Sequence, residues 1–360
     1  MNRLRIGVDA RELLGARTGV GRYLGELMTR WTSRADAAGR EFLLYAPEPL
    51  ALDWPHTTTR VAPGGRGTWW EQTTLGSAVR GDALDVFFAP AYTAPLRLEA
   101  PLAVTIHDVS FSRRPEWFRP RERHRRHLLT RSAARRAGVI ITVSEFSRGE
   151  IAEVYGVPST RIRVIHNGLS PRRVGAAAAR EPLVLFTGSI FNRRRVPDLI
   201  AAFATVVASV PQARLVIAGD NRTWPFEDLA AIAAALGVGD RVRVVDYVTD
   251  AERDDLYARA SAFAFLSEYE GFGFTPLEAI AAGVPAVVAE TAVAREIYGD
   301  VVTRVPIGDI DATARALVQL LTSREQAAAQ IAAAPARLDR YSWERAAADT
   351  LSAIEGIARR

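Results

Sequence analysis

Two glutamates frame a glycine-rich stretch at residues 270–278, which reads EGFGFTPLE. Gly271 and Gly273 would let the backbone approach a ligand closely. A loop that enters a helix directs its N–H groups and the positive end of the helix dipole at one point, which suits an anion. Pro276 fits the first turn of such a helix. Glu270 and Glu278 would then flank a bound phosphate. A tight strand-to-helix turn with two solvated glutamates would explain the same residues.

Three consecutive arginines, Arg193–Arg195, could hold that phosphate. A guanidinium is a planar fork that can grip a phosphate through two hydrogen bonds, whereas a lysine acts as a point charge. All 46 basic residues of this chain are arginine, so any cation that assists catalysis must be one. An isolated triplet of this kind is commonly a surface feature, and the sequence does not decide which two arginines would face a phosphate.

Two further candidates lie in the first half of the chain. His107 and Asp108 end a predicted strand, where ligand-facing residues of an open α/β sheet are expected; a lone histidine there is also compatible with a structural role. GVGRYLG at 19–25 has the spacing G-x-G-x-x-x-G and begins several residues beyond the preceding strand. It therefore does not match the dinucleotide-binding fingerprint, and a dehydrogenase is disfavoured. Ser144 and Ser147 are expected to cap a helix.

Alternating strand-like and helix-like stretches must position these residues. Apolar and β-branched runs predict strands at 4–10, 41–47, 83–90, 102–108, 138–144, 161–168, 183–189, 213–220, 241–248, 262–267 and 285–290. Helical spacing predicts helices at 21–33, 120–136, 197–209, 226–236 and 275–282, and an alanine-rich helical tail from Asp311 onward. This alternation is typical of parallel sheets covered by helices on both faces.

A break in this pattern predicts two domains. SPRRVGAAAAREP at 170–182 has no strand or core signal. We therefore expect an α/β chain with two tandem Rossmann-like domains facing a central cleft. The predicted divisions are a first domain at 1–172, a linker at 173–182, a second domain at 183–340 and a C-terminal helix at 341–360. One long doubly wound sheet is the alternative.

Composition bounds the possible functions. The chain has 360 residues, 48% hydrophobic residues and a net charge of +5. That charge is too small to argue for a nucleic-acid partner. There is no cysteine and there are five histidines, so thiolate chemistry is excluded and a histidine-rich metal site is not expected. No apolar run reaches the roughly 18 residues of a membrane span. The N-terminal segment does not resemble a signal peptide, so a cytoplasmic protein is expected.

In their order along the chain, these segments resemble glycosyltransferase family four. Residues 270–278 are similar to its donor-binding motif of two glutamates, and 188–203 is similar to its strand end, Arg-Lys pair and following helix. YSWERAAADTL at 341–351 resembles the C-terminal helix that crosses back to the first domain. Further similar blocks lie at 16–27, 104–118, 141–158 and 163–169. The resemblance spans nearly the whole chain and implies the GT-B fold.

The resemblance implies a role for each matching residue. Arg193 and Arg194 match the pair that contacts the donor diphosphate, although the second position is lysine in the family. Glu278 matches the glutamate that binds the nucleotide ribose. Glu270 and His107 match residues beside the donor sugar. The expected catalytic residues are therefore His107, Arg193 and Glu270, and the expected donor-binding residues are Gly19, Gly21, Arg193, Arg194, Glu270, Gly271, Phe272, Gly273, Phe274, Thr275 and Glu278.

The reaction that the resemblance implies is a retaining transfer of a hexose from a nucleotide sugar, with GDP-mannose as the first expectation. The acceptor would be a glycan, a lipid-linked glycan or a small molecule, in polysaccharide assembly. Arginines and a helix N-terminus would stabilise the leaving diphosphate, and no Asp-x-Asp lies between the predicted strands, so no metal or other cofactor is expected. An epimerase or phosphorylase on the same fold and a binding module without catalysis are the alternatives.

Residues 119–136 contain eight arginines and one glutamate. This segment predicts either a solvated helix face or a patch that attaches to an anionic membrane surface or a pyrophosphate-lipid acceptor.

Overall fold

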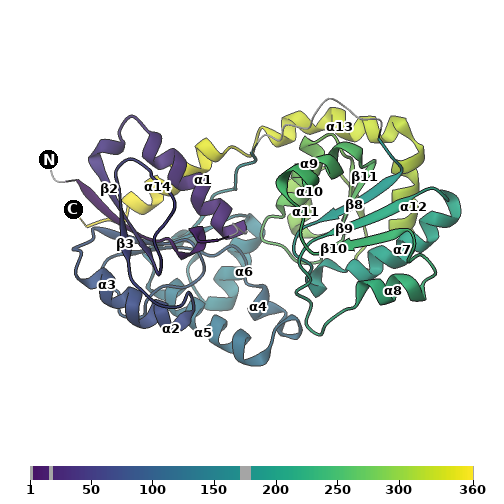
Figure 1. The fold of residues 1–360 in the computed structure, drawn as a ribbon. Helices are drawn as coiled ribbons and strands as arrows, with labels where there is room; N and C mark the ends of the chain where they lie inside the picture. Colours follow the sequence, from purple (N-terminus) through teal and green to yellow (C-terminus); the bar gives the residue numbers. More distant parts are fainter. Residues whose placement is uncertain (1–2, 16–18, 171–179, 360) are drawn as a thin grey trace. The chain divides into compact units, whose positions relative to one another are not determined.

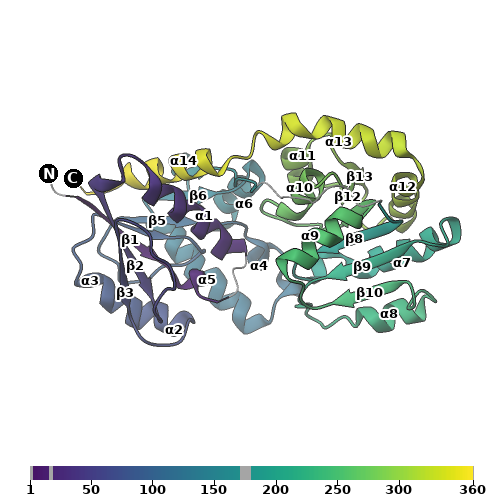
Figure 2. The same ribbon diagram turned by 45° about the horizontal axis from the view of Figure 1, so that its top comes forward.

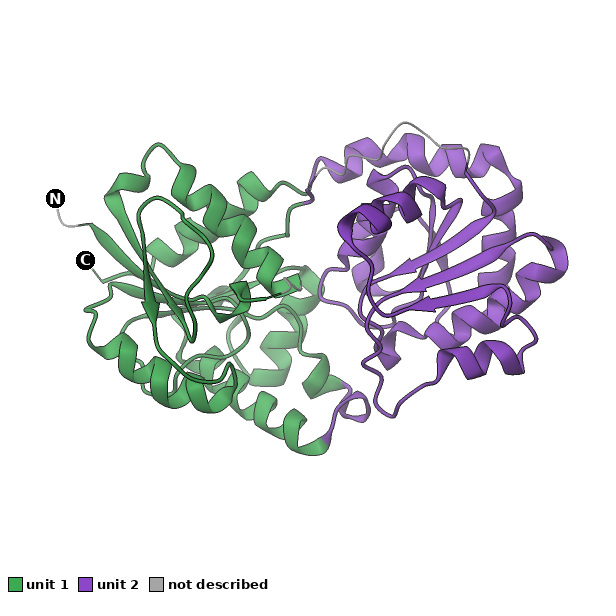
Figure 3. Ribbon diagram, viewed as in Figure 1, with its two compact units in different colours: residues 1–113, 120–168, 341–360 green, residues 114–119, 169–340 purple. Residues whose placement is uncertain are grey.

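The computed structural model describes residues 3–15, 19–170 and 180–359. The chain forms two compact units (Figure 3). The first unit comprises Met1–Arg113, Pro120–Gly168 and Tyr341–Arg360, and the second comprises Arg114–Arg119 and Leu169–Arg340. Each unit contains one parallel sheet with helices, so the predicted α/β fold class is confirmed. No helix within the described ranges combines the length and apolar character that crossing a membrane requires.

The predicted linker at 173–182 lies outside the described residues up to residue 179. Its last residues belong to the second unit. The Arg180 guanidinium donates hydrogen bonds to the main-chain oxygens of Tyr257, Ala260 and Ala282. These oxygens lie at the ends of two helices, so Arg180 ties the entry of the chain to the body of this unit.

The first unit has a seven-stranded sheet in the order β3-β2-β1-β4-β5-β6-β7, with all neighbours parallel (Figure 1). Strands β4, β5 and β6 are buried along their whole length, as strands covered on both faces are. The edge strand β3 was not predicted, because its sequence TTTRV lacks an apolar run. The strands are β1 (Leu4–Asp9), β2 (Arg40–Ala46), β3 (Thr57–Val61), β4 (Val86–Ala89), β5 (Leu102–Thr105), β6 (Val139–Thr142) and β7 (Ile162–Val164).

Helices cover both faces of this sheet. Trp31 of α1 stacks on Phe42 and donates to the Ala347 oxygen of α14 at 2.7 Å, so α1 and α14 share a face. On the opposite face, Trp70 and Tyr155 join one core cluster. The helices and turns are α1 (Gly19–Ser33), α2 (Thr68–Trp70), α3 (Gly76–Arg80), α4 (Ser110–Arg113), α5 (Pro120–Arg136), α6 (Glu145–Tyr155), α14 (Trp343–Glu355), η1 (Arg11–Leu13), η2 (Ala37–Gly39), η3 (Glu71–Leu75), η4 (Pro115–Trp117) and η5 (Ser159–Arg161).

The second unit has a six-stranded parallel sheet in the order β10-β9-β8-β11-β12-β13. Helices surround it (Figure 2). Strand β13 was not predicted, because it is a three-residue edge strand. The elements are β8 (Leu183–Thr187), β9 (Arg214–Ala218), β10 (Val242–Val245), β11 (Ala262–Phe265), β12 (Ala286–Ala289), β13 (Thr303–Val305), η6 (Asn192–Arg194), α7 (Val196–Ser209), α8 (Leu229–Ala235), α9 (Asp250–Arg259), α10 (Phe274–Ala281), α11 (Ala292–Tyr298), α12 (Ile310–Thr322) and α13 (Arg324–Leu338).

Each sheet reverses its direction of winding at one point. In the first unit the reversal lies between β1 and β4, and in the second it lies between β8 and β11. The loops that leave the carboxyl ends of two such strands diverge to opposite faces, which opens a crevice where ligands of open α/β sheets bind. The candidate residues after β8 and β11 therefore flank one switch point. The loops after β1 and β4 flank the other.

Candidate active site

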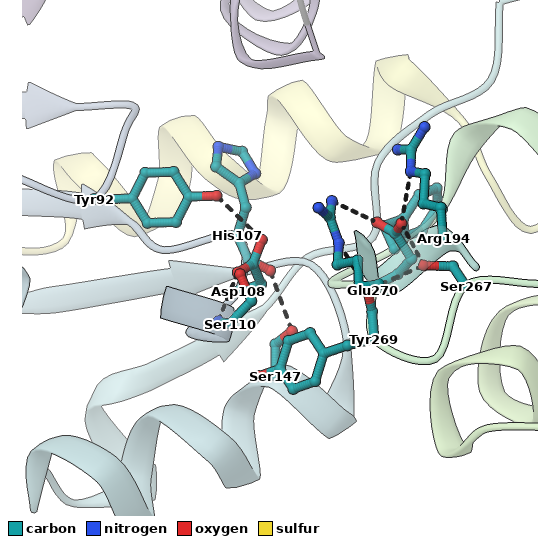
Figure 4. A network of polar contacts seen from close by, with 12 residues as sticks. Tyr92, His107, Asp108, Ser110, Ser147, Arg194, Ser267, Tyr269 and Glu270 are labelled. Atoms are coloured by element: carbon teal, nitrogen blue, oxygen red, sulfur yellow. Dashed lines mark hydrogen bonds and ion pairs between the residues drawn. The ribbon is translucent and has the colours of Figure 1, made fainter. Parts of the chain in front are cut away.

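Arg193 and Arg194 converge on Glu270 in the second unit, although 76 residues separate Arg194 from that glutamate. The Nε atom of Arg194 lies 3.3 Å from Glu270 Oε1, and Nη2 of Arg193 lies 3.6 Å from Oε2 (Figure 4). Arg193 also donates to the Tyr269 oxygen at 3.0 Å, and Ser267 donates to Glu270 at 2.9 Å. Two cations and one carboxylate leave the cluster with a net positive charge, which suits an anionic ligand.

Arg195 faces away from this cluster. It has a left-handed conformation with φ of 50° at the start of α7. Its guanidinium pairs with Asp198 at 2.6 Å and with Glu268 at 3.5 Å. The sequence left open which two of the three arginines act together, and the structure groups Arg193 with Arg194.

Arg194 presents an unpartnered donor beside Gly188. Its guanidinium lies over the Phe265 ring at 5.0 Å, and its buried Nη1 has no hydrogen-bond partner in the described structure. Thr275 Oγ1, at the start of α10, is likewise buried without a partner. Gly188 has φ of 114°, and a Cβ there would lie 2.7 Å from Arg194 Nη1 and 3.6 Å from Thr275 Cγ2. Buried polar groups are normally satisfied, so Arg194 Nη1 and Thr275 Oγ1 are available to bind a polar ligand.

Burial is the largest influence on the pKa of Arg194 and lowers it. The nearby Glu270 raises that pKa, and Arg193 lowers it further. A buried guanidinium with an unused donor is costly without a compensating anion. Binding a phosphate would supply that compensation.

The glycine-rich segment forms the predicted strand–loop–helix arrangement. Gly273 is left-handed with φ of 79° and precedes α10, and a Cβ on it would lie 2.0 Å from the Tyr298 hydroxyl. Tyr298 in turn donates to the Gly273 oxygen at 3.0 Å. Gly271 and Phe272 are buried, and the Phe272 ring packs edge-on against Phe274 at 5.2 Å. These aromatic side chains therefore contribute packing, while the backbone and Thr275 provide polar groups.

Glu278 is the fifth residue of α10 and is 4% exposed. The predicted position one turn into the helix therefore holds. Carboxylates buried this deeply normally have polar partners, because burying an unpaired charge is costly.

His107 lies in the first unit, two residues after β5. Its Nε2 is 2.9 Å from the Pro90 oxygen, and because a carbonyl can only accept, Nε2 carries the proton and Nδ1 the lone pair. The ring contacts Tyr23 of α1 edge-on at 5.0 Å. Burial lowers the pKa of His107, and the Pro90 carbonyl and Asp108 oppose it. The imidazole is therefore a neutral hydrogen-bonding group at pH 7.

Hydrogen bonds of Asp108 and Ser147 hold the chain at and after His107 (Figure 4). Asp108 Oδ1 accepts from the Ser110 N–H at 2.8 Å and from its hydroxyl at 2.6 Å, and Oδ2 accepts from the Tyr92 hydroxyl at 3.2 Å. Ser144 caps α6 through the Ser147 N–H, as predicted, while the Ser147 hydroxyl donates to the His107 oxygen at 3.1 Å. Ser144 is therefore the cap, whereas Ser147, also predicted to cap, lies inside α6 and holds the strand end that carries His107.

Gly19 and Gly21 lie in the first turn of α1, which begins two residues before the predicted helix at 21–33. Helical spacing continues through both glycines because Leu24 and Leu27 bury the same helix against the sheet. Among the described residues, no atom lies within 4 Å of a Cβ built on Gly19, so their packing does not require glycine there.

Sequence reasoning missed a buried ion triad in the first unit. Arg11 of η1 pairs with Asp9 at 2.8 Å and with Glu71 of η3, and all three side chains are less than 10% exposed. Burial raises the pKa of Asp9 to about 6, and Glu71 adds to the effect while Arg11 opposes it. Asp9 ends β1 beside the switch point, and this position in the sequence could have identified it as a candidate.

Within the described residues, no group of three or more His, Asp or Glu side chains is arranged to hold a metal ion. The sequence contains an Asp-x-Asp after the last predicted strand, at Asp309–Asp311. Asp309 accepts from the Ala312 N–H at 2.8 Å and so caps α12. This pair therefore serves as a helix start.

Comparison with known proteins covers both units. The family model described as Glycosyltransferase Family 4 matches residues 18–173, and that described as Glycosyl transferases group 1 matches residues 171–337. The O-antigen chain mannosyltransferase B of Escherichia coli is 27% identical over 336 residues, which are 90% of this chain and 84% of that protein.

Two other similar proteins extend this comparison. A GDP-mannose:cellobiosyl-diphosphopolyprenol alpha-mannosyltransferase of Komagataeibacter xylinus is 31% identical over 210 residues, which are 56% of this chain and 51% of that protein. The solved structure of a sucrose-phosphate synthase from Thermosynechococcus elongatus matches with a TM-score of 0.79, covering 99% of both chains at 18% identity. At 18% identity, the structural match shows similarity of fold alone.

Proposed function

This chain belongs to glycosyltransferase family four and has the GT-B fold, and we propose that it transfers mannose from GDP-mannose to a glycan or lipid-linked acceptor with retention at the anomeric carbon. The observation that carries the proposal is the convergence of Arg193, Arg194 and Glu270 beside Gly188, with unpartnered donors on Arg194 and Thr275. The two mannosyltransferase relatives favour mannose, and the name of one specifies GDP-mannose.

The arginine pair would stabilise the leaving group. As the bond between the sugar C1 and the diphosphate oxygen breaks, its electron pair passes to the diphosphate. Arg193, Arg194 and the N-terminus of α10 can carry that charge, because donors fixed in a dry site need no reorganisation. We propose on this basis that transfer requires no divalent metal.

The two glutamates would divide the recognition of the donor. Glu270 lies beside the arginines that would hold the diphosphate, so its carboxylate could also accept hydrogen bonds from hydroxyls of the sugar. Glu278 lies eight residues later, one turn into α10, where its buried carboxylate would accept from the nucleotide ribose. Gly271, Gly273 and Phe274 would shape the backbone between them.

The first unit would supply the remaining groups. The neutral His107 offers its Nδ1 lone pair to a hydroxyl of the donor sugar, since Nε2 already donates to Pro90. Gly19 and Gly21 would admit the donor to the start of α1. The acceptor oxygen would then bond to C1 on the face that the diphosphate leaves, and its proton would pass to the departing phosphate oxygen. The name of one relative specifies an alpha-mannosyl product, and an α-product formed from an α-linked donor would be net retention.

Nucleotide binding by isothermal titration calorimetry tests these roles. Glu278→Gln should weaken GDP and GDP-mannose by a similar factor of about ten or more, because the ribose is common to both. Glu270→Gln should weaken the binding of GDP-mannose while leaving the Kd for GDP within about twofold of the wild-type value. Glu290→Gln, a strand-end carboxylate that pairs with Arg295 and Arg304, is the matched control. An unchanged Kd for GDP in Glu278→Gln would contradict the proposal that Glu278 binds the ribose.

A donor panel separates this function from its alternatives. The wild-type chain should bind GDP-mannose more tightly than UDP-glucose and should consume it only when an acceptor glycan is present. Conversion of the sugar nucleotide without acceptor would instead indicate an epimerase. Binding without turnover toward any glycan or polyprenol-linked acceptor would indicate a binding module. The anomeric configuration of the product, measured by NMR, checks retention.

We also propose that α5 contacts an anionic membrane surface. Arg121, Arg125, Arg126 and Leu128 are exposed on this helix, and Leu128 is 48% exposed. Clustered arginines attract anionic lipid headgroups, and an exposed leucine among them can enter the interface. Such a position would suit a lipid-linked acceptor.

Sedimentation with vesicles tests this contact. Vesicles of phosphatidylglycerol should bind the protein at low salt, whereas phosphatidylcholine vesicles should not. The double variant Arg121→Glu, Arg125→Glu should reduce binding at least tenfold. Arg315→Glu, an exposed arginine on α12 of the second unit, should retain it. Equal binding by both variants would contradict the assignment to α5.

A further inference from the structure

Tyr92 has an unusual backbone conformation beside the switch point of the first unit. Its φ is 63°, in the left-handed region that bulky residues seldom adopt. The Thr93 N–H donates to the Ala91 oxygen at 2.6 Å, which closes a three-residue γ-turn around Tyr92. A γ-turn with positive φ is strained, and such strain persists only where surrounding contacts impose it.

Contacts on both sides impose this turn. The Tyr92 N–H donates to the Thr105 oxygen of β5 at 2.8 Å. The Thr93 hydroxyl donates to Glu71 Oε2 at 2.6 Å, and Glu71 is itself held by the buried Arg11. The ion triad that sequence reasoning missed therefore anchors the end of the turn.

The same turn supplies partners to both His107 and Asp108. The Pro90 oxygen accepts the His107 Nε2–H, and the Tyr92 hydroxyl donates to Asp108 Oδ2 (Figure 4). The Tyr92 ring also contacts the His107 ring at 5.6 Å and the Phe111 ring at 5.7 Å, both near edge-on. A change in the turn would thus move a carbonyl that fixes the imidazole and a phenol that fixes the neighbouring carboxylate.

We propose that Tyr92 is a positioning residue, whose strained turn fixes the His107 imidazole as the Nε2–H tautomer and so leaves Nδ1 with a lone pair that can accept a hydrogen bond. The proposal rests on the role of His107 proposed above. A tyrosine serves this purpose because one side chain provides an aromatic face for the imidazole and a hydroxyl for Asp108. The phenol–carboxylate bond, together with the anchored Thr93, offsets the strain of the turn.

The test uses Tyr92→Phe, which retains the ring and removes the bond to Asp108. Side-chain ¹⁵N chemical shifts report the tautomer of each histidine, and His107→Gln identifies the signal of His107. We expect the Nε2–H fraction of His107 to fall in Tyr92→Phe. We also expect kcat to fall about tenfold, as for loss of a hydrogen bond to a charged group, while the Kd for GDP is unchanged.

Thr93 provides an independent perturbation. Thr93→Val removes the hydroxyl bond to Glu71 at nearly constant volume, and it should shift the His107 signals and kcat in the same direction as Tyr92→Phe. Thr93→Ser retains the hydroxyl and should restore both. This pair separates the bond that anchors the turn from the shape of the side chain.

Tyr45→Phe is the matched control, because the Tyr45 hydroxyl also donates to a carboxylate, Asp82 Oδ2, at 2.7 Å. It should leave the His107 signals and kcat unchanged. If Tyr92→Phe lowers the melting temperature as Tyr45→Phe does but leaves the His107 tautomer and kcat unchanged, the proposal is overturned. The NMR measurement needs no substrate. A shifted tautomer in a protein without transferase activity would therefore refute the proposed function while supporting the positioning role.

Discussion

Adjacent arginines have different surroundings at the end of β8. Arg193 and Arg194 share Glu270, and each has a side chain only 13% exposed. Arg195 is 30% exposed and pairs with Asp198 and Glu268. The turn η6 explains the division, because the left-handed Arg195 ends the turn and begins α7. Two of the three guanidinium groups therefore lie in the candidate donor site.

Alanine at Arg194 should impair turnover far more than a change at Arg195. Arg194→Ala removes a buried charge and leaves Glu270 partly unpaired. The fall in kcat/KM should therefore correspond to a loss of about 2–5 kcal/mol of transition-state stabilisation. Arg195→Asn tolerates the left-handed backbone and removes pairs of limited value, so it should cost less than about 1 kcal/mol. Steady-state kinetics with both variants provides the measurement. Equal losses would show that burial does not distinguish these arginines.

At the scale of elements, α14 is fixed to the first unit by close backbone contact. A Cβ on Gly168 would lie 2.2 Å from the Trp343 nitrogen and 2.5 Å from its Cα. Trp343, Leu351 and Ile354 are buried on this helix. Gly168 therefore lets the chain that leaves the first unit pass directly against the chain that returns to it.

Gly168→Ala should destabilise the first unit, because the clash involves backbone that cannot move without displacing α14. The expected loss is at least about 1–3 kcal/mol in the free energy of unfolding, measured by urea denaturation. Gly149→Ala in α6 is the control, since a Cβ there meets no atom within 4 Å. It should stabilise by about 0.4–1 kcal/mol. A neutral Gly168→Ala would mean that α14 docks less tightly than this geometry requires.

At the scale of the whole molecule, arginine carries every positive side-chain charge except that of protonated histidine. A guanidinium stays protonated under physiological conditions and can bind a diphosphate through two donors. The pair at 193–194 thus provides permanent charge at the same switch point as the N-terminus of α10. We expect metal-independent transfer because these fixed positive groups can stabilise the leaving diphosphate.

Turnover should therefore persist in EDTA, at a rate within about twofold of that in the presence of magnesium, because fixed cations perform the stabilisation that a metal would otherwise provide. Initial rates in EDTA, magnesium and manganese check this. Activity that disappears with chelator and returns only with a divalent ion would contradict the proposed mechanism.

Local patterns alone determined much of the fold. The helix at 120–136 has the predicted bounds, and β8 and β11 lie within the predicted runs. The predictions succeeded here because a buried parallel strand must be apolar on both faces, and because the helix begins at a proline and has arginines in its last turn. Resemblance, rather than periodicity, assigned roles to Glu270, Glu278 and the arginines. Their catalytic roles stay predictions.

Only the tertiary structure decided which side chains meet. Strand order brings Arg194 and Glu270 together across 76 residues, and it groups Arg193 with Arg194 while Arg195 pairs elsewhere. The structure also revealed the γ-turn at Tyr92, whose N–H donates to the Thr105 oxygen of β5. No local pattern encodes these features, because they depend on contacts between loops that follow neighbouring strands. The sequence specifies strands and helix ends through nearby residues, but sheet order determines which loop ends share a site.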